Sequence, residues 1–209
     1  MLLSGRGSNF EALADSVAAG RIPNVEIALV ISHREGAPGI ERARARGIDA
    51  RVIPSKGLER EIYDRQIVAV LQEKKIDLVC LAGYMRLLSP YFVQAFRGRI
   101  LNIHPSLLPA FPGLESQRQA LEHGVKFAGC TVHFVDETLD AGPIILQSAV
   151  PIRDDDTVDS LSERILAEEH RIYSESVRIV LEGRFRLESR RVIILPDAPI
   201  AESAAKKHV

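Results

Sequence analysis

An amide, an imidazole and a carboxylate stand beside proline-rich or glycine-containing turns of this chain. Asn102 and His104 lie in the run N-I-H-P-S-L-L-P at 102–109, and Asp140 lies in L-D-A-G-P at 139–143. Acyl transfer through a tetrahedral intermediate needs a donor for the developing oxyanion, a proton carrier and a group that controls the charge of that carrier. The types of these side chains therefore fit one reaction class.

Each residue also has a structural interpretation. A lone histidine is more often a hydrogen-bonded surface or core residue, and Asp-Ala-Gly is a common way to reverse a chain. The catalytic interpretation of His104 is favoured because an amide lies just upstream and prolines at 105, 109 and 112 stiffen the segment after it. If the loop of Asp140 folds back over the sheet edge, its carboxylate meets His104 and favours the charged, donating imidazole.

A glycine-rich turn follows the short apolar start. The run G-R-G-S-N at 5–9 precedes a helical pattern, Ser8 and Asn9 can cap that helix, and its free amides and dipole favour a phosphate. A plain capped turn is the alternative. The third glycine of a dinucleotide fingerprint is missing, so the run does not indicate a dinucleotide site.

A second candidate binding segment is G-Y-M-R-L-L-S-P at 83–90, which follows a predicted strand. In open α/β sheets, ligands bind outside the carboxyl ends of strands. Met85, Leu87 and Leu88 offer an apolar slot that suits a flat heteroaromatic ring. They could equally be ordinary core residues at the start of the next helix, and spacing alone leaves both interpretations open.

The composition and charge of the chain exclude several classes of protein. The chain has 209 residues, 46% hydrophobic and 26% charged, with net charge −1, which points to a globular protein and to neither nucleic acid nor an anionic membrane. No apolar run approaches the roughly 20 residues of a membrane helix, and the start does not resemble a signal peptide. Cys80 and Cys130 form no C-x-x-C pair, so we expect reduced thiols in a cytoplasmic protein and no metal site.

Periodicity predicts the elements that position these residues. Apolar runs at 25–31, 78–82 and 100–102 indicate strands covered on both faces, the last ending at Asn102 with His104 just beyond it. Helical patterns at 9–19, 39–46 and 58–74 separate them, with Gly47 as a C-terminal cap. This alternation predicts an α/β fold with a doubly wound, mostly parallel sheet and right-handed crossovers.

The second half of the chain changes character. Runs at 125–135 and 143–151 indicate antiparallel strands added to the sheet, and Thr131 and His133 share one face of the first, in a supporting or structural role. Residues 157–183 form one long helical pattern; the aspartates at 154–156 either suit its N-terminal end or form a cation site. A hairpin is predicted within 185–194. We expect one domain at 1–195 and a frayed tail at 196–209.

Several of these segments, in one order, resemble the phosphoribosylglycinamide formyltransferases (GAR transformylases), a folate-dependent family of purine synthesis. The most specific stretches are 3–9, 81–90, 101–113 and 133–147, within a likeness over about residues 1–185. The resemblance implies a Rossmann-like formyltransferase fold and transfer of a formyl group from 10-formyltetrahydrofolate, as co-substrate, to the amine of glycinamide ribonucleotide. It also implies no metal.

The resemblance assigns roles by position. The catalytic trio is Asn102, His104 and Asp140. The residues that bind glycinamide ribonucleotide are Gly7, Ser8 and Asn9 at the phosphate and Glu169 at the glycinamide end. The residues that bind the folate are Arg60, Met85, Arg86, Leu87, Leu88 and Asn102, with a phosphate contact as the alternative for Arg60.

The chain also departs from the family. Its first strand is short, and Glu115, Ser116 and Gln117 stand where relatives often carry histidines. Rival interpretations keep the fold and change the acceptor, as in methionyl-tRNA formyltransferase or formyltetrahydrofolate hydrolase, or reduce the protein to a non-catalytic folate- or phosphate-binding module. The tRNA enzyme usually has a further domain and a basic surface. The oligomeric state is not fixed by any pattern, and a homodimer stays open.

Overall fold

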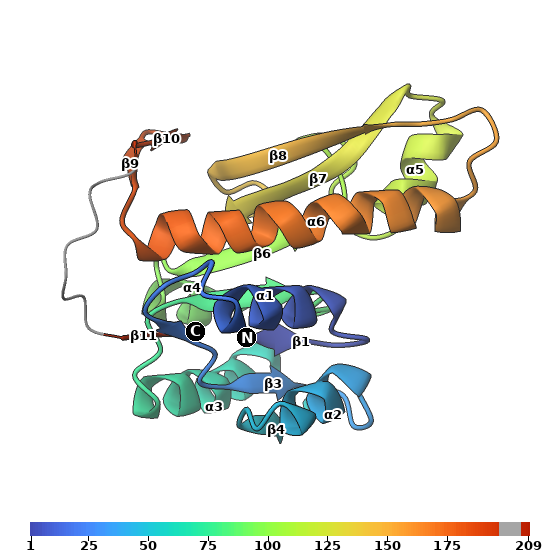
Figure 1. Ribbon diagram of the computed structural model, residues 1–209. Coiled ribbons are helices and arrows are strands. Elements are labelled where there is room, and N and C mark those ends of the chain that lie inside the picture. The colour runs from blue at the N-terminus through green and yellow to red at the C-terminus, as the bar shows by residue number, and fades with distance from the viewer. Residues whose placement is uncertain (197–205) are drawn as a thin grey trace. The chain divides into compact units, whose positions relative to one another are not determined.

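The computed structural model describes residues 1–196 and 206–209 and divides into two compact units (Figure 1). We call Met1–Leu101 with Pro196–Val209 the N-terminal unit and Asn102–Leu195 the C-terminal unit. The division falls inside strand β6 (Ile100–His104). The prediction of one domain over 1–195 stays a prediction.

The N-terminal unit contains a parallel sheet with strand order β4-β3-β1-β5-β6. Its further strands are β1 (Leu2–Leu3), β3 (Val30–Ser32), β4 (Ala50–Val52) and β5 (Val79–Ala82). β1 pairs in parallel with both β3 and β5, and β3 with β4. The strand residues of β1, β3 and β5 are buried, as expected for a sheet covered on both faces.

Helices connect these strands and confirm the predicted alternation. They are α1 (Ser8–Ala18), α2 (Pro38–Ala45), α3 (Arg60–Glu73) and α4 (Pro90–Ala95). Each presents its periodic apolar residues to the core: Phe10 and Leu13 in α1, and Ile67 and Leu71 in α3, are buried. Gly47 follows α2 with φ +71°, the left-handed conformation of a C-terminal cap.

The strand predicted over 25–31 is wrong in its extent. It divides into β2 (Val25–Glu26) and β3, and β1 is in register with β3 from Leu2, opposite Ile31. β2 pairs instead with β11 (Lys207–His208) at the chain end, and Val209 is buried. The expected fraying therefore does not hold for the last residues, while 197–205 lie outside the described residues.

The C-terminal unit has strand order β6-β7-β8-β10-β9. Its further strands are β7 (Phe127–Phe134), β8 (Ile144–Pro151), β9 (Phe185–Glu188) and β10 (Arg191–Ile194). The antiparallel pair β7–β8 and the hairpin β9–β10 confirm the predictions for 125–151 and 185–194. Its helices are α5 (Ser116–Glu122) and α6 (Val158–Leu181).

Helix α6 is the long helix predicted over 157–183, and it packs against β7 and β8. Thr157 is its N-cap and forms a capping box with Ser160. Asp156 lies just before it, where its carboxylate accepts hydrogen bonds from Arg164 at 2.7 and 2.8 Å and from the Arg153 amide at 2.7 Å. The bonded Arg164 guanidinium holds the pKa of Asp156 well below its usual range.

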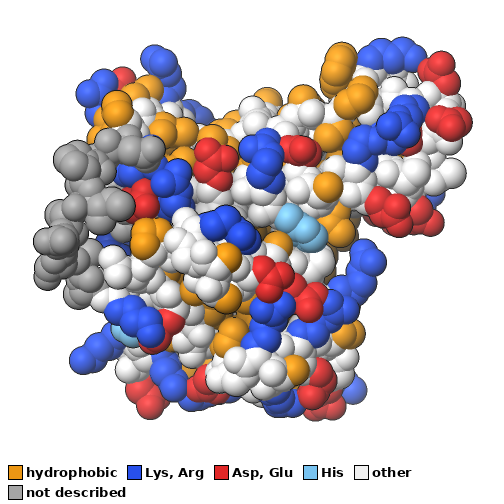
Figure 2. Space-filling view, in the orientation of Figure 1, with side chains coloured by type: hydrophobic (Ala, Val, Ile, Leu, Met, Phe, Trp, Pro, Cys, Tyr) orange, Lys and Arg blue, Asp and Glu red, His pale blue; other side chains and the backbone are white. Residues whose placement is uncertain are grey.

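The outer surface matches the balanced composition. Figure 2 shows acidic and basic side chains mixed over the face drawn, as a net charge of −1 leads one to expect. Among residues 1–196 and 206–209, no helix combines the length and the apolar content needed to span a bilayer.

Candidate active site

Strand β6 carries the first two residues of the trio. It runs on to His104 rather than ending at Asn102, so the predicted strand end is two residues short. Because strand side chains alternate, Asn102 and His104 lie on the same face of β6, while Ile103 points the other way and is buried. The two polar side chains therefore share one side of the sheet.

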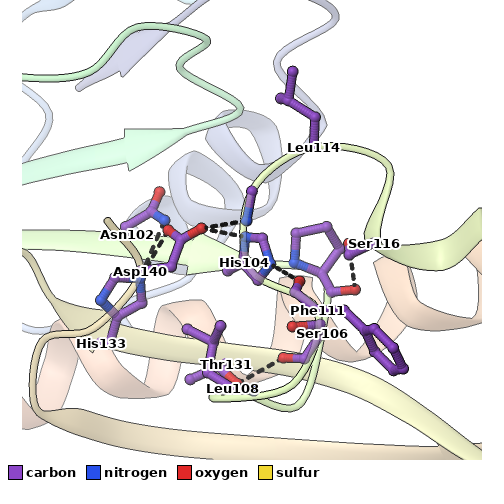
Figure 3. Close-up of polar contacts among 12 residues, drawn as sticks. Asn102, His104, Ser106, Leu108, Phe111, Leu114, Ser116, Thr131, His133 and Asp140 are labelled. Atoms are coloured by element: carbon purple, nitrogen blue, oxygen red, sulfur yellow. Dashed lines mark hydrogen bonds and ion pairs between the residues drawn. The ribbon is translucent and has the colours of Figure 1, made fainter. Parts of the chain in front are cut away.

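The loop between β7 and β8 brings the carboxylate to them (Figure 3). Asp140 Oδ2 lies 3.5 Å from His104 Nδ1, and both side chains are almost fully buried. Asp140 has φ +48°, a conformation that aspartate tolerates better than most residues. A Cβ on Gly142 would lie 1.8 Å from the Phe134 carbonyl oxygen, so this loop needs glycine there to pack against β7. The predicted meeting of Asp140 and His104 is present.

The segment after His104 folds onto the same two side chains. His104 Nε2 lies 2.9 Å from the Phe111 carbonyl oxygen, which can only accept, so this nitrogen carries a proton. The Gly113 amide donates to Asp140 Oδ2 at 2.8 Å. With Nε2 used in this way, Nδ1 is the imidazole nitrogen that faces the carboxylate (Figure 3).

His133 completes the cluster. Its Nδ1 lies 2.8 Å from the Phe134 carbonyl oxygen, so Nδ1 carries the proton of the neutral ring. Its Nε2 then accepts from Asn102 Nδ2 at 3.2 Å, and Asp140 Oδ1 lies 3.8 Å from the same Nε2. Burial lowers the pKa of His133, against the Phe134 hydrogen bond and the Asp140 charge that raise it. A neutral His133 thus fixes which way the Asn102 amide points.

Glu169 is buried on α6 in the same unit. Burial raises the pKa of the Cys130 thiol on β7 to about 12, and the charges of Glu169 and Glu168 add to this shift. Both cysteines are free and buried, in line with the expectation of reduced structural thiols. Glu169 is therefore a carboxylate inside the unit, on the side of α6 that reaches β7.

In the N-terminal unit, the glycine turn leads into α1. Gly7 is the N-cap with φ +79°, and a Cβ there would lie 2.8 Å from Gly39 Cα. No side chain caps the helix, so the expected capping by Ser8 and Asn9 is wrong; both are helical residues, and Asn9 is buried. The two glycine backbones approach closely at this turn, and the first amides of the helix have no side-chain cap.

The 83–88 segment displays its apolar side chains. Met85 and Leu87 are 54% and 52% exposed, so the core interpretation does not hold for them, and Leu88 is half-buried. The turn is anchored by Ser4, whose amide donates to the Gly83 carbonyl at 3.1 Å and whose hydroxyl accepts from the Met85 amide at 2.8 Å.

The predicted folate-binding arginines differ in their surroundings. Arg86 stacks 4.6 Å from the centroid of the Tyr63 ring and donates to Ser55 Oγ at 2.8 Å. Arg60 is exposed at the first residue of α3. Both act on the buried Asp64: burial raises the pKa of this carboxyl above its usual value, and the Ser89 hydrogen bonds and these two charges only partly offset the rise. Arg86 is held in place, whereas Arg60 extends from a helix end.

Sequence reasoning missed part of this constellation. The Phe111 carbonyl and the Gly113 amide are backbone atoms with no side-chain signature, and the pattern around His133 fits both a supporting and a structural role. Its alternation with Thr131 on β7 was the available signal. Among the described residues, no group of three or more His, Cys, Asp or Glu is arranged to hold a metal ion.

Comparisons with known proteins agree on one family. The model of the family described as formyl transferase matches residues 1–177. The chain is 42% identical to the phosphoribosylglycinamide formyltransferase of Escherichia coli strain K12, over 90% of this chain and 88% of that protein. A crystal structure of glycinamide ribonucleotide transformylase 1 from Symbiobacterium toebii superposes with a TM-score of 0.91 at 57% identity, covering 93% of this chain and 92% of that one.

Longer relatives contain a similar region. The trifunctional purine biosynthetic protein adenosine-3 of Homo sapiens is 49% identical over 90% of this chain, which spans only 18% of that protein. The chain therefore corresponds to one part of that relative and to most of the bacterial ones.

Proposed function

The chain belongs to the formyl transferase family, and from that premise we propose that it transfers the formyl group of 10-formyltetrahydrofolate to the amine of glycinamide ribonucleotide in purine biosynthesis. The contact of His104 Nδ1 with Asp140 Oδ2 at 3.5 Å, beside Asn102 on the same strand, carries the proposal. It supplies a charged proton carrier and an oxyanion donor without a nucleophilic side chain, which suits direct attack by the substrate amine.

The amine attacks the formyl carbon, and negative charge develops on the formyl oxygen. Asn102 Nδ2 donates one N–H to His133 Nε2, which leaves its second N–H for that oxygen. His104 gives Nε2–H to Phe111, so the proton that it offers the oxygen sits on Nδ1 and is shared with Asp140 Oδ2, which lies 3.5 Å away. Two such donors, preorganised in a buried site, stabilise the tetrahedral intermediate, and each is typically worth about 10²–10³ in rate.

Asp140 keeps His104 charged through this step. Its carboxylate faces Nδ1 and is itself fixed by the Gly113 amide. It also helps to order a water that carries the proton from the attacking amine to the leaving folate nitrogen. When the intermediate collapses, the carbon–nitrogen bond to the folate breaks, and no covalent enzyme intermediate forms.

The binding roles rest on position within the family. We assign the substrate phosphate to the turn of Gly7, Ser8 and Asn9, which supplies backbone amides at a helix N-terminus. Glu169 contacts the glycinamide end. The folate side is assigned to the exposed apolar pair Met85 and Leu87, with Leu88, Arg86 and Arg60. The activity belongs in the cytoplasm, where the buried thiols stay reduced.

One assay tests the proposal against its rivals. Purified protein is mixed with 10-formyltetrahydrofolate, with and without glycinamide ribonucleotide, and deformylated folate is followed. Acceptor-dependent turnover is expected, together with a loss of about 10²–10³ in kcat for His104→Ala. Acceptor-independent formate release would instead indicate a hydrolase, and binding without turnover a folate- or phosphate-binding module. Near-normal turnover by the variant would remove the assignment of His104.

A further inference from the structure

We propose that Thr131 and Gln147 are positioning residues for catalysis, forming a clamp that sets the orientation of His104. The inference deepens the proposed function and rests on it. Thr131 lies on β7 and Gln147 on β8, opposite each other in the register of the antiparallel pair. Both side chains bond to the chain segment that follows His104, so each acts on the imidazole through that segment.

The clamp closes on the turn at 106–108. Thr131 is fully buried, and its hydroxyl donates to the Ser106 carbonyl at 2.7 Å while accepting from the Leu108 amide at 3.0 Å (Figure 3). Gln147 Nε2 donates to the Leu108 carbonyl and to Thr131 Oγ1, both at 2.9 Å. Since Nε2 has two protons and both are used, the donor and acceptor directions of this network are fully determined.

This turn connects to the imidazole. Ser106 Oγ donates to the Ala110 carbonyl at 2.6 Å, one residue before Phe111, whose carbonyl accepts from His104 Nε2. The clamp therefore fixes both the chain leaving His104 and the carbonyl that decides which imidazole nitrogen carries a proton toward Asp140. A displacement of that carbonyl would change ring orientation without altering any residue of the trio.

Packing reinforces the same turn. A Cβ on Gly129 would lie 2.8 Å from Leu107 Cδ2 and 2.0 Å from the Ser148 carbonyl oxygen, so Leu107 rests directly on bare backbone of β7. The turn is thus held by side-chain hydrogen bonds on one part and by close van der Waals contact on another. Buried networks of this kind are sensitive because a single lost partner leaves polar groups unsatisfied.

The test compares Thr131→Val with Thr131→Ser. Valine keeps the volume and removes the hydroxyl, so we expect kcat to fall at least about tenfold while both KM values stay within about twofold, because a small misplacement of catalytic groups is costly. Serine keeps the hydroxyl and should restore kcat to within about threefold. Gln147→Met should lower kcat by a smaller factor, and the double variant should show non-additive loss, since the two side chains bond to each other.

Ser148→Ala is the matched control on β8, because its hydroxyl bonds to Glu168 and Arg171, away from the turn. It should leave kcat unchanged. Turnover is compared below the melting temperature of each variant, so that lost stability is separated from lost positioning. If Thr131→Val does not fold, Gln147→Met, at an exposed position, decides the question.

Measurements that do not depend on turnover test the clamp separately from the proposed function. Hydrogen exchange of the Leu108 amide, which Thr131 protects, should speed up in Thr131→Val and stay slow in Thr131→Ser, and the ¹⁵N resonances of His104 should shift only in the valine variant. These signals are measured even if the wild type shows no transformylase activity. Wild-type Leu108 exchange and His104 resonances in Thr131→Val, or equal defects in the serine and valine variants, would overturn the clamp.

Discussion

The proposed catalytic cluster and the exposed apolar pair of the proposed folate side are held in opposite ways. In the C-terminal unit, His104, Asp140 and His133 are buried and joined to one another or to nearby backbone groups. In the N-terminal unit, Met85 and Leu87 are about half exposed. Under the proposed function, the groups that meet the reacting carbon are fixed before substrate arrives, which lowers the reorganisation needed during the reaction.

The contrast predicts different kinetic signatures. Substitutions within the bonded cluster should lower kcat, because they disturb interactions that gain strength in the transition state. Substitutions among the displayed apolar residues should raise KM and leave kcat nearly unchanged, because they remove binding common to ground and transition states. Single substitutions on each side of this division test it.

The largest effect is expected from Asp140→Asn. The amide keeps the shape and loses the negative charge that faces His104 Nδ1, so kcat should fall by about 10²–10³ with little change in KM. Steady-state kinetics with both substrates measures this. Asp155→Asn, at an exposed aspartate before α6, is the control and should match the wild type. A variant that keeps wild-type kcat would place Asp140 outside the chemistry.

The second largest fall in kcat is expected from Gly142→Ala. The added methyl would lie 1.8 Å from the Phe134 carbonyl oxygen, so the Asp140 loop must move, and a shift of about 1 Å can cost about 10² in kcat. Gly183→Ala is the control, since its φ is +68° but, apart from its chain neighbours, no described residue lies within 4 Å of the new Cβ. That variant should lose some stability and keep its turnover. Unchanged kcat in Gly142→Ala would show that the loop tolerates the shift.

Leu87→Ser tests the binding side. Removing a half-exposed leucine that a ligand would cover should cost roughly 1 kcal/mol of binding, or about a fivefold rise in the KM for 10-formyltetrahydrofolate. Leu187→Ser on β9 is matched, since both leucines are 52% exposed. Leu187→Ser should leave both kcat and the KM for 10-formyltetrahydrofolate unchanged. A fall in kcat without a rise in KM would erase the distinction between the two regions.

The smallest effect concerns stability alone, at the start of α6. The pKa of Asp156 is depressed by Arg164, so the pair stabilises the fold above the ordinary carboxyl pKa of 3.8 and this contribution is lost as pH falls. Melting curves between pH 2 and 7 should show Asp156→Asn less stable than wild type at pH 7 and approaching it toward the acid end. A constant difference across that range would mean that charge is not the cause.

Sequence patterns predicted the elements best where the signal is local and periodic. The long helix at α6, the hairpin β9–β10 and the antiparallel pair β7–β8 follow from apolar spacing and turn residues, and all are confirmed. The extent of β3 could not be predicted in the same way. It depends on where β1 begins to pair, a non-local contact that no window of sequence contains.

At the candidate site, too, the sequence predicts local features better than non-local contacts. The trio was predicted from residue types beside turns, and the meeting of His104 with Asp140 needed only the assumption that one loop folds back. The orientation of the Asn102 amide depends on the neutral tautomer of His133, which follows from a hydrogen bond to the Phe134 carbonyl. Backbone partners such as Phe111 and Gly113 are set by chain geometry and leave no mark in the residue types.

Strand β6 contributes residues to both units, with Leu101 counted in one and Asn102 in the next. A recombinant fragment ending at Leu101 would therefore stop partway along a strand, and the complementary fragment would start at Asn102, the proposed oxyanion donor, with a charged amino group. Both pieces would expose unpaired backbone of the kind that promotes aggregation. Protein engineers who want to split or permute this protein should place the break elsewhere and carry 100–104 intact.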